Sequence, residues 1–189
     1  MSLGTRDAYR RAAAGFDSLV KQIGDEQWAA TTPCSEWDVR ALVGHLVYED
    51  LWAVPLFAGQ TIEQVGDRLE GDNLGDDPRA AWDRAYADAM QAISDDDVMA
   101  RKVHLSYGEE TAENYAFQLF LDHLVHGWDL ARGIGANDRL EPELVDHALG
   151  WVQENQAMLQ GSGAFGSEVE VPPDADEQTK LLAALGRTG

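Results

Sequence analysis

Two histidines and one aspartate are the side chains of this sequence best suited to holding a metal ion. Asp122 and His126 lie four positions apart, so in a helix they project from one face and can converge on one ion. His45 is the third candidate, because it also falls within an apolar stretch. Two imidazoles and one carboxylate suit zinc, nickel or iron(II), and three protein ligands leave coordination positions open for water or a substrate. The residue types and their spacing therefore predict a divalent-metal site.

Other interpretations of these stretches remain open. Asp122 and His126 also fit a hydrogen-bonded pair inside one helix, with His45 as a core histidine and no metal, because isolated pairs of this spacing are common. Glu49 follows His45 by four residues and is a competing ligand, and His123 would replace His126 if the helix were rotated. Because His123 points about a third of a turn away from Asp122, we expect it to be solvent-exposed or at an interface.

The other candidate side chains are expected to be structural. His104 and His147 have no partner at ligand spacing, so we interpret both as surface residues. Cys34 is the single cysteine, and no histidine flanks it in the sequence, so packing is its expected role. Trp37 and Trp128 are expected to anchor the core.

The stretch 111–131 must position two of the three metal candidates. It is apolar nearly all round, which indicates a buried helix. At 3.6 residues per turn, Gln118 and Asp129 share a stripe of this helix with Asp122 and His126. A buried carboxylate without a partner costs several kcal/mol or takes up a proton, so this stripe must meet a cation, a hydrogen-bond donor or a metal.

The remaining elements follow from apolar periodicity and from helix-capping signals. The helix that carries His45 is predicted to open at a capping box of Ser35 and Asp38 and to end near Pro55 or Gly59. The other predicted elements are helices over 5–23, 78–93 and 142–161, a short terminal helix holding Leu181, Leu182 and Leu185, a crossover over 60–77, an extended segment over 103–108, and a glycine-rich turn with an extended piece over 161–173. Four long helices with one long crossover predict an all-α bundle with accessory C-terminal helices.

Length and charge restrict the class of protein. The 189 residues fit one domain, with 1–160 as the metal-binding bundle and 161–189 as an extension whose short helix packs on it. The net charge of −20 repels phosphate backbones and anionic membranes, so nucleic acid is not an expected partner. No stretch approaches the roughly 18 apolar residues of a spanning helix, and the N-terminal stretch does not show the basic-then-apolar layout expected of a secretory signal. With a single cysteine, this predicts a cytoplasmic protein.

Two stretches of the sequence carry a family resemblance. Residues 32–46, T-P-C-S-E-W-D-V-R-A-L-V-G-H-L, and residues 122–131, D-H-L-V-H-G-W-D-L-A, resemble the metal-binding domain of mycothiol-dependent maleylpyruvate isomerase, a family of the DinB-like superfamily. The C-terminal stretches 165–173 and 181–187 resemble a tail typical of actinobacterial members. The resemblance implies a DinB-like four-helix bundle that holds a metal between its helices.

The resemblance also implies ligands and a function. The histidines of the two family motifs match His45 and His126, and the third ligand matches Asp122, where the isomerase itself carries a longer glutamate. The isomerase also has a further C-terminal domain that helps to form its substrate site. The implied function is therefore that of a divalent-metal protein, with zinc or nickel expected, which uses mycothiol and a small electrophile for transfer, isomerisation or detoxification.

Two other functions and the oligomeric state stay open. A protein of this fold that binds a metal or a small ligand without turnover is the main alternative, and the shorter carboxylate at Asp122 suits it. A metal-assisted hydrolase is a third class, but the sequence supplies no obvious general base for it. A homodimer is compatible with the sequence and is not required by it.

Overall fold

A computed structural model describes residues 3–162 and 166–188 of the chain. Most of these residues are helical, and the described contacts divide them into two compact units, one ending at Asp138 and the other beginning at Arg139. Each unit is described by itself. The turn predicted over 161–173 includes residues 163–165, which lie outside the described part.

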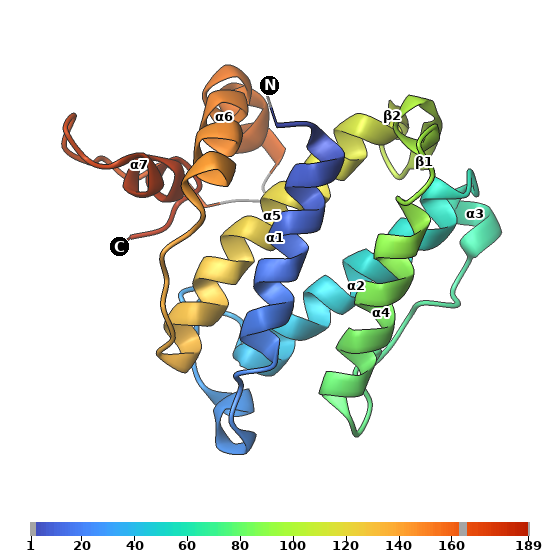
Figure 1. Cartoon of the computed structure of the whole chain (residues 1–189), viewed down its shortest axis with the longest axis horizontal. Helices are drawn as coiled ribbons and strands as arrows, with labels where there is room; N and C mark the ends of the chain where they lie inside the picture. The colour runs from blue at the N-terminus through green and yellow to red at the C-terminus, as the bar shows by residue number, and fades with distance from the viewer. Residues whose placement is uncertain (1–2, 163–165, 189) are drawn as a thin grey trace. The chain divides into compact units, whose positions relative to one another are not determined.

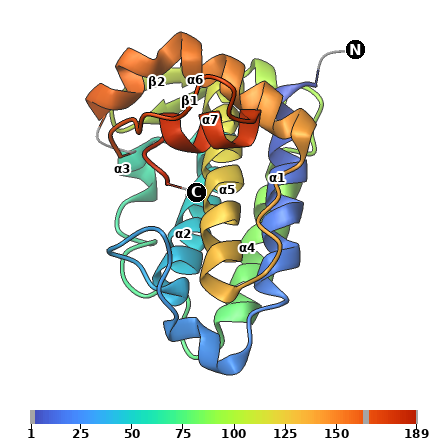
Figure 2. The ribbon, with the colours of Figure 1, turned by 90° about the vertical axis from the view of Figure 1, so that its left-hand side faces the viewer.

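The first unit is a bundle of four long helices. α1 (Thr5–Val20) contacts α4 (Pro78–Ala92) and α5 (Ala112–Ile134), and α2 (Val39–Phe57) contacts the same two, so the four helices close a ring (Figure 1). In Figure 2, α5 lies between α1 and α2. This arrangement confirms the predicted all-α, DinB-like four-helix bundle.

Side-chain caps set where the bundle helices begin. Asp38, Asp77 and Thr111 precede α2, α4 and α5, and each accepts a hydrogen bond from the backbone N–H three residues later, at 2.8, 3.0 and 3.1 Å. Such caps satisfy N–H groups that have no partner within the helix. The cap of α2 is therefore Asp38 alone, and the capping box predicted to start at Ser35 was wrong, because Ser35 belongs to the turn before the helix.

A long crossover joins α2 to α4 because the two helices are parallel. The two helices are neighbours and run the same way in Figure 1, so the chain must return along the bundle between them. The return was predicted at 60–77 and contains the short helix α3 (Ile62–Val65), which the sequence analysis missed. Gly66, Gly71 and Gly75 adopt positive φ values in this segment, a conformation that glycine adopts without steric cost.

A small hairpin precedes α5. β1 (Lys102–Leu105) and β2 (Gly108–Thr111) pair in antiparallel fashion, with Leu105 opposite Gly108. The extended segment predicted at 103–108 is thus the first strand and turn of this hairpin, which is the only sheet in the described part of the chain.

The second unit contains two helices that pack against each other. α6 (Pro142–Ser162) contacts α7 (Glu177–Ala184), and the side chain of Asp176 caps α7. The extended piece before α7 is tied to it, because Val169 donates a backbone hydrogen bond of 2.9 Å to the Ala183 carbonyl. The domain boundary expected near residue 160 stays a prediction.

Candidate metal centre

His45 on α2 lies beside Asp122 and His126 on α5. His45 Nε2 is 2.8 Å from Asp122 Oδ2, and His126 Nε2 is 3.3 Å from Asp122 Oδ1. The two imidazole rings are 5.2 Å apart between centroids. One donor atom from each of the three side chains lies within 4.8 Å of the other two. The bundle thus brings together all three residues that the sequence analysis named as ligands.

The three side chains differ in their access to solvent. His126 is nearly buried, with 6% of its side chain exposed, whereas His45 and Asp122 retain 24% and 20%. The cluster is therefore closed on the His126 side and open beside the other two. Such an opening is what a metal site needs if water or a substrate is to reach the ion.

The charges within this cluster favour an ionised carboxylate. Burial acts to raise the pKa of Asp122, but the imidazoles of His126 and His45 outweigh it and hold this pKa far below its ordinary value. Burial also opposes a charged His126 ring, yet Asp122, and after it Asp129 and Cys34, raise the pKa of His126 well above its ordinary value. Without a cation, these side chains therefore form an ion-pair network.

Asp129 and Cys34 form a second layer behind His126. His126 Nδ1 is 2.9 Å from Asp129 Oδ2, and Asp129 is fully buried. The Cys34 thiol donates to the same oxygen at 3.1 Å, and its sulfur is 3.8 Å from His126 Nδ1. These three residues also have donor atoms within 4.8 Å of one another. With Nδ1 held by Asp129, the Nε2 atom of His126 is the one directed at Asp122.

Trp37 covers both imidazoles. Its ring centroid lies 4.7 Å from that of His45 and 5.5 Å from that of His126. The turn that presents Trp37 and Cys34 is held by Thr32, whose hydroxyl donates to the Trp37 carbonyl at 2.7 Å and accepts from the Cys34 N–H at 3.2 Å. The T-P-C-x-x-W motif therefore acts as a structural unit at the site.

A glycine of α5 lets this turn lie against the helix. A Cβ atom on Gly133 would meet the Thr32 side chain at 3.2 Å and the Thr31 carbonyl at 3.3 Å, both tighter than ordinary contact. The roles of Asp129, Cys34 and Trp37 were missed in the sequence analysis. The spacing of Asp129, three residues after His126, could have indicated that it contacts His126. The contacts of Cys34 and Trp37 could not be predicted in this way, because they depend on how the turn before α2 folds against α5.

In the described part of the chain, the other candidate side chains do not join the three converging donors. Glu49 is half-buried, and burial followed by the negative charge of Asp122 raises its pKa. It belongs to neither set of converging donors in the described part of the chain. His104 in β1 is half-buried, so part of it reaches the surface as expected. His147 on α6 is also half-buried rather than fully exposed.

His123 is fully buried, which corrects the expectation of an exposed or interface histidine. Its ring packs edge-on against Tyr9 and lies 6.1 Å from the rings of Phe16 and Trp82. Its Nδ1 is 2.8 Å from the Leu119 carbonyl. The prediction assumed that only the face of α5 with Asp122 is covered. Other helices also pack on the face that carries His123.

Comparison with known proteins identifies the family of the first unit. A family model for the mycothiol maleylpyruvate isomerase N-terminal domain matches residues 9–131, which include α2 and α4 and most of α1 and α5. The chain belongs to this family. The match spans His45, Asp122 and His126, together with the turn that carries Cys34 and Trp37.

Two curated relatives extend the similarity beyond the family model. Both are uncharacterized proteins of Mycobacterium tuberculosis, from strains CDC 1551 / Oshkosh and ATCC 25618 / H37Rv, and each is 29% identical to this chain over 187 residues, covering 96% of both sequences. No solved structure matches the chain. Among the described residues, no helix combines the length and apolar character that crossing a bilayer requires.

Proposed function

We propose that this family member is a divalent-metal-binding protein that acts as an enzyme on a low-molecular-weight thiol, with mycothiol as that thiol. His45, Asp122 and His126 would hold the ion, and zinc or nickel fits two imidazoles and a carboxylate. The observation that carries the proposal is the convergence of these donor atoms, from two helices, to within 4.8 Å of one another at a partly open site. Family membership supports the choice of thiol.

The chemistry expected of such a centre is activation of sulfur. A divalent cation bound there would lower the pKa of a coordinated thiol from its usual value of about 8.5, so that thiolate is available at neutral pH. The thiolate then suits addition to a small electrophile, in transfer, isomerisation or detoxification.

The protein residues would position the site and limit its access to water. Asp129 accepts from His126 Nδ1 and so keeps Nε2 directed toward Asp122. Trp37 shields the faces of both imidazoles. Glu49 lies one helical turn beyond His45, and its raised pKa makes it the carboxyl group here best suited to exchanging a proton closer to neutral pH. We also propose a cytoplasmic location, on the net charge and the single cysteine.

The proposal is tested by thiol binding and consumption. Metal-loaded protein should bind mycothiol in calorimetry and consume it in the presence of a panel of electrophiles that includes maleylpyruvate. His45→Ala should lose both activities, whereas His104→Ala, a histidine variant away from the site, should retain them. Failure of the metal-loaded protein to bind mycothiol would contradict the proposal, and binding without consumption would support the non-catalytic alternative.

Asp129 gives a separate prediction about metal affinity. In Asp129→Asn the charged acceptor for His126 Nδ1 is lost while the size of the side chain is kept, so we expect zinc affinity to fall roughly 10- to 100-fold. Competition with a chromophoric chelator measures this change. Asp83→Asn, at an exposed position of α4, is the matched control. Equal affinities of the two variants would show that Asp129 does not support the metal ligand.

A further inference from the structure

His126 lies between two carboxylates, one beside each nitrogen of its ring. Nε2 is 3.3 Å from Asp122 Oδ1, and Nδ1 is 2.9 Å from Asp129 Oδ2. A neutral imidazole carries one N–H and one lone pair, so it can bind a metal through only one of these nitrogens at a time. The other nitrogen then donates to its carboxylate, which is the usual support of a metal-bound histidine. The ring of His126 can therefore serve a cation on either side.

The donors on the Nδ1 side are spaced like the ligands of one ion. Cys34 Sγ is 3.1 Å from Asp129 Oδ2 and 3.8 Å from His126 Nδ1, and the third separation is 2.9 Å. With zinc bonds of about 2.3 Å to sulfur and about 2.0 to 2.2 Å to nitrogen or oxygen, tetrahedral ligand atoms lie roughly 3.4 to 3.6 Å apart. Every separation here is within about 0.5 Å of that range, so small side-chain shifts would complete the set.

The charges on this side match those of a divalent cation. Asp129 is fully buried and His126 is nearly so, which makes an uncompensated charge costly at this place. A divalent cation that binds here displaces the thiol proton of Cys34 to solvent. The thiolate and the Asp129 carboxylate then carry two negative charges against the two positive charges of the ion. The candidate centre on the other side of the ring offers only one carboxylate, Asp122.

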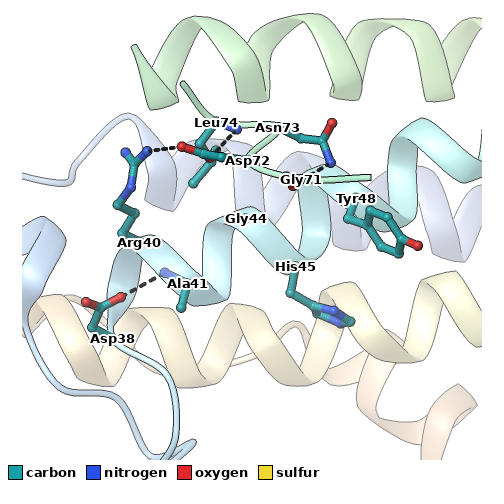
Figure 3. A pocket seen from close by; sticks show the side chains of 10 residues that line it. All are labelled: Asp38, Arg40, Ala41, Gly44, His45, Tyr48, Gly71, Asp72, Asn73 and Leu74. Carbon is teal, nitrogen blue, oxygen red and sulfur yellow. Dashed lines mark hydrogen bonds and ion pairs between the residues drawn. The ribbon is translucent and has the colours of Figure 1, made fainter. Parts of the chain in front are cut away.

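The two sides of His126 differ in donor chemistry and in access. Thiolate sulfur favours soft, thiophilic cations, whereas the donors of the first centre are nitrogen and oxygen alone. In Figure 3, His45 lines a cavity of about 390 Å³ between α2 and the crossover. Cys34 and Asp129 are not part of the lining of that cavity. Cys34 is half-buried in the turn before α2, so the Nδ1 side has its own contact with solvent.

We propose that Cys34, Asp129 and His126 Nδ1 form a second metal position, here called the sulfur position, which binds a thiophilic divalent cation. It is filled in alternation with the first centre, because both need the lone pair of the same imidazole. An ion at the sulfur position leaves His126 Nε2 as a hydrogen-bond donor to Asp122. A thiophilic cation therefore disables the first centre. Only this alternation rests on the ligand set of the proposed function.

The first experiment uses cadmium as the probe, because charge transfer from thiolate to cadmium absorbs in the ultraviolet. Titration of metal-free protein should produce this band, with saturation at about one equivalent. Cys34 is the single cysteine, so Cys34→Ser should lose the band. Ser35→Ala, at the exposed next position of the turn, should keep it. Absence of the band in the wild type would overturn the proposal.

Two further variants separate a built site from a thiol that binds cadmium alone. Asp129→Asn should weaken cadmium binding at least roughly tenfold, measured by competition with a chelator. His45→Ala should keep both the band and the affinity, because His45 is not a ligand of the sulfur position. Unchanged affinity in Asp129→Asn would show adventitious binding to the thiol. Loss of the band in His45→Ala would place the sulfur in the first centre, and either result would overturn the proposal.

The second experiment tests the alternation through the histidine ring. In protein with ¹⁵N-labelled histidine and bound ¹¹³Cd, the scalar coupling from the metal should reach His126 Nδ1 in the wild type and Nε2 in Cys34→Ser. Two equivalents of cadmium bound to the wild type would refute the alternation. If Cys34→Ser binds no cadmium while the wild type shows the full band, the first centre and the proposed function fail and the sulfur position stands.

Discussion

Replacing Asp122 with asparagine should reduce the zinc or nickel bound to the purified protein from about one equivalent to below roughly a tenth. Asp122 contributes an oxygen to both imidazoles, at 2.8 and 3.3 Å, and it is the carboxylate of the set. A neutral amide is a poor ligand for a divalent cation. The two imidazoles that remain would hold the cation only weakly. Elemental analysis of protein prepared without chelator measures the loss.

A matched control variant and the unfolding temperature provide two further tests of this prediction. Asp83→Asn should keep the full metal content, since Asp83 is exposed on α4. Added zinc should raise the unfolding temperature of the wild type and of Asp83→Asn, because a ligand that binds only the folded state stabilises it. It should not raise that of Asp122→Asn. A full equivalent of zinc in Asp122→Asn would exclude His45, Asp122 and His126 as the ligand set.

The affinity of the same site should rise with pH. Asp122 keeps its charge across the neutral range, because its pKa is held low, but the pKa of His126 is raised in the metal-free protein. Below that pKa the His126 ring carries both protons, and a cation must displace one of them to bind. Zinc affinity is therefore expected to fall as the pH is lowered, with release of protons on binding. Calorimetry in buffers of different ionisation enthalpy measures the number released.

Replacing Asp50 with alanine should have the largest effect on folding. Asp50 is fully buried on α2, where its Oδ1 accepts from the Tyr9 hydroxyl at 2.7 Å and lies 3.4 Å from His123 Nε2. Burial opposes a charged His123, but Asp50 outweighs it and raises the pKa of this histidine. Removing one partner of a buried pair leaves the other uncompensated, so we expect a loss of about 3 to 5 kcal/mol in the free energy of unfolding.

Urea unfolding of metal-free protein measures this loss, and graded variants keep the test informative if Asp50→Ala does not fold. Asp50→Asn retains an acceptor for Tyr9 and should cost less than the alanine variant. Tyr9→Phe removes one hydrogen bond and should cost about 1 kcal/mol. Asp88→Ala, at an exposed position of α4, should leave the free energy of unfolding nearly unchanged. An Asp50→Ala protein as stable as Asp88→Ala would show that the buried network contributes nothing.

This network was not predictable from the sequence. Tyr9, Asp50 and His123 come from three helices, and none has a partner within four residues that would reveal the cluster. Tyr9 was placed correctly on the apolar stripe of its helix, whereas His123 was expected to be solvent-exposed or at an interface. Spacing along one helix indicates which residues share a face, but it does not indicate which helix will cover that face.

The sequence by itself determined the bundle and the region of the site. Apolar periodicity predicted the four long helices because burial of one helical face repeats every 3.6 residues, and the long crossover followed from a stretch without such a period. The motifs at 32–46 and 122–131 indicated both the family and the three converging side chains. The helices are set by local sequence, whereas the expectation that His45 meets Asp122 and His126 rested on the family resemblance that the two motifs carry together.

Tertiary structure alone decided the surroundings of these side chains. Asp129 meets His126 and Cys34, Trp37 covers both imidazoles, and the crossover closes a cavity beside His45 only because separate segments pack at one place. Such contacts depend on the rotation of each helix and on the path of its connections. Those are set by the packing of the whole core, where every side chain must fit at once.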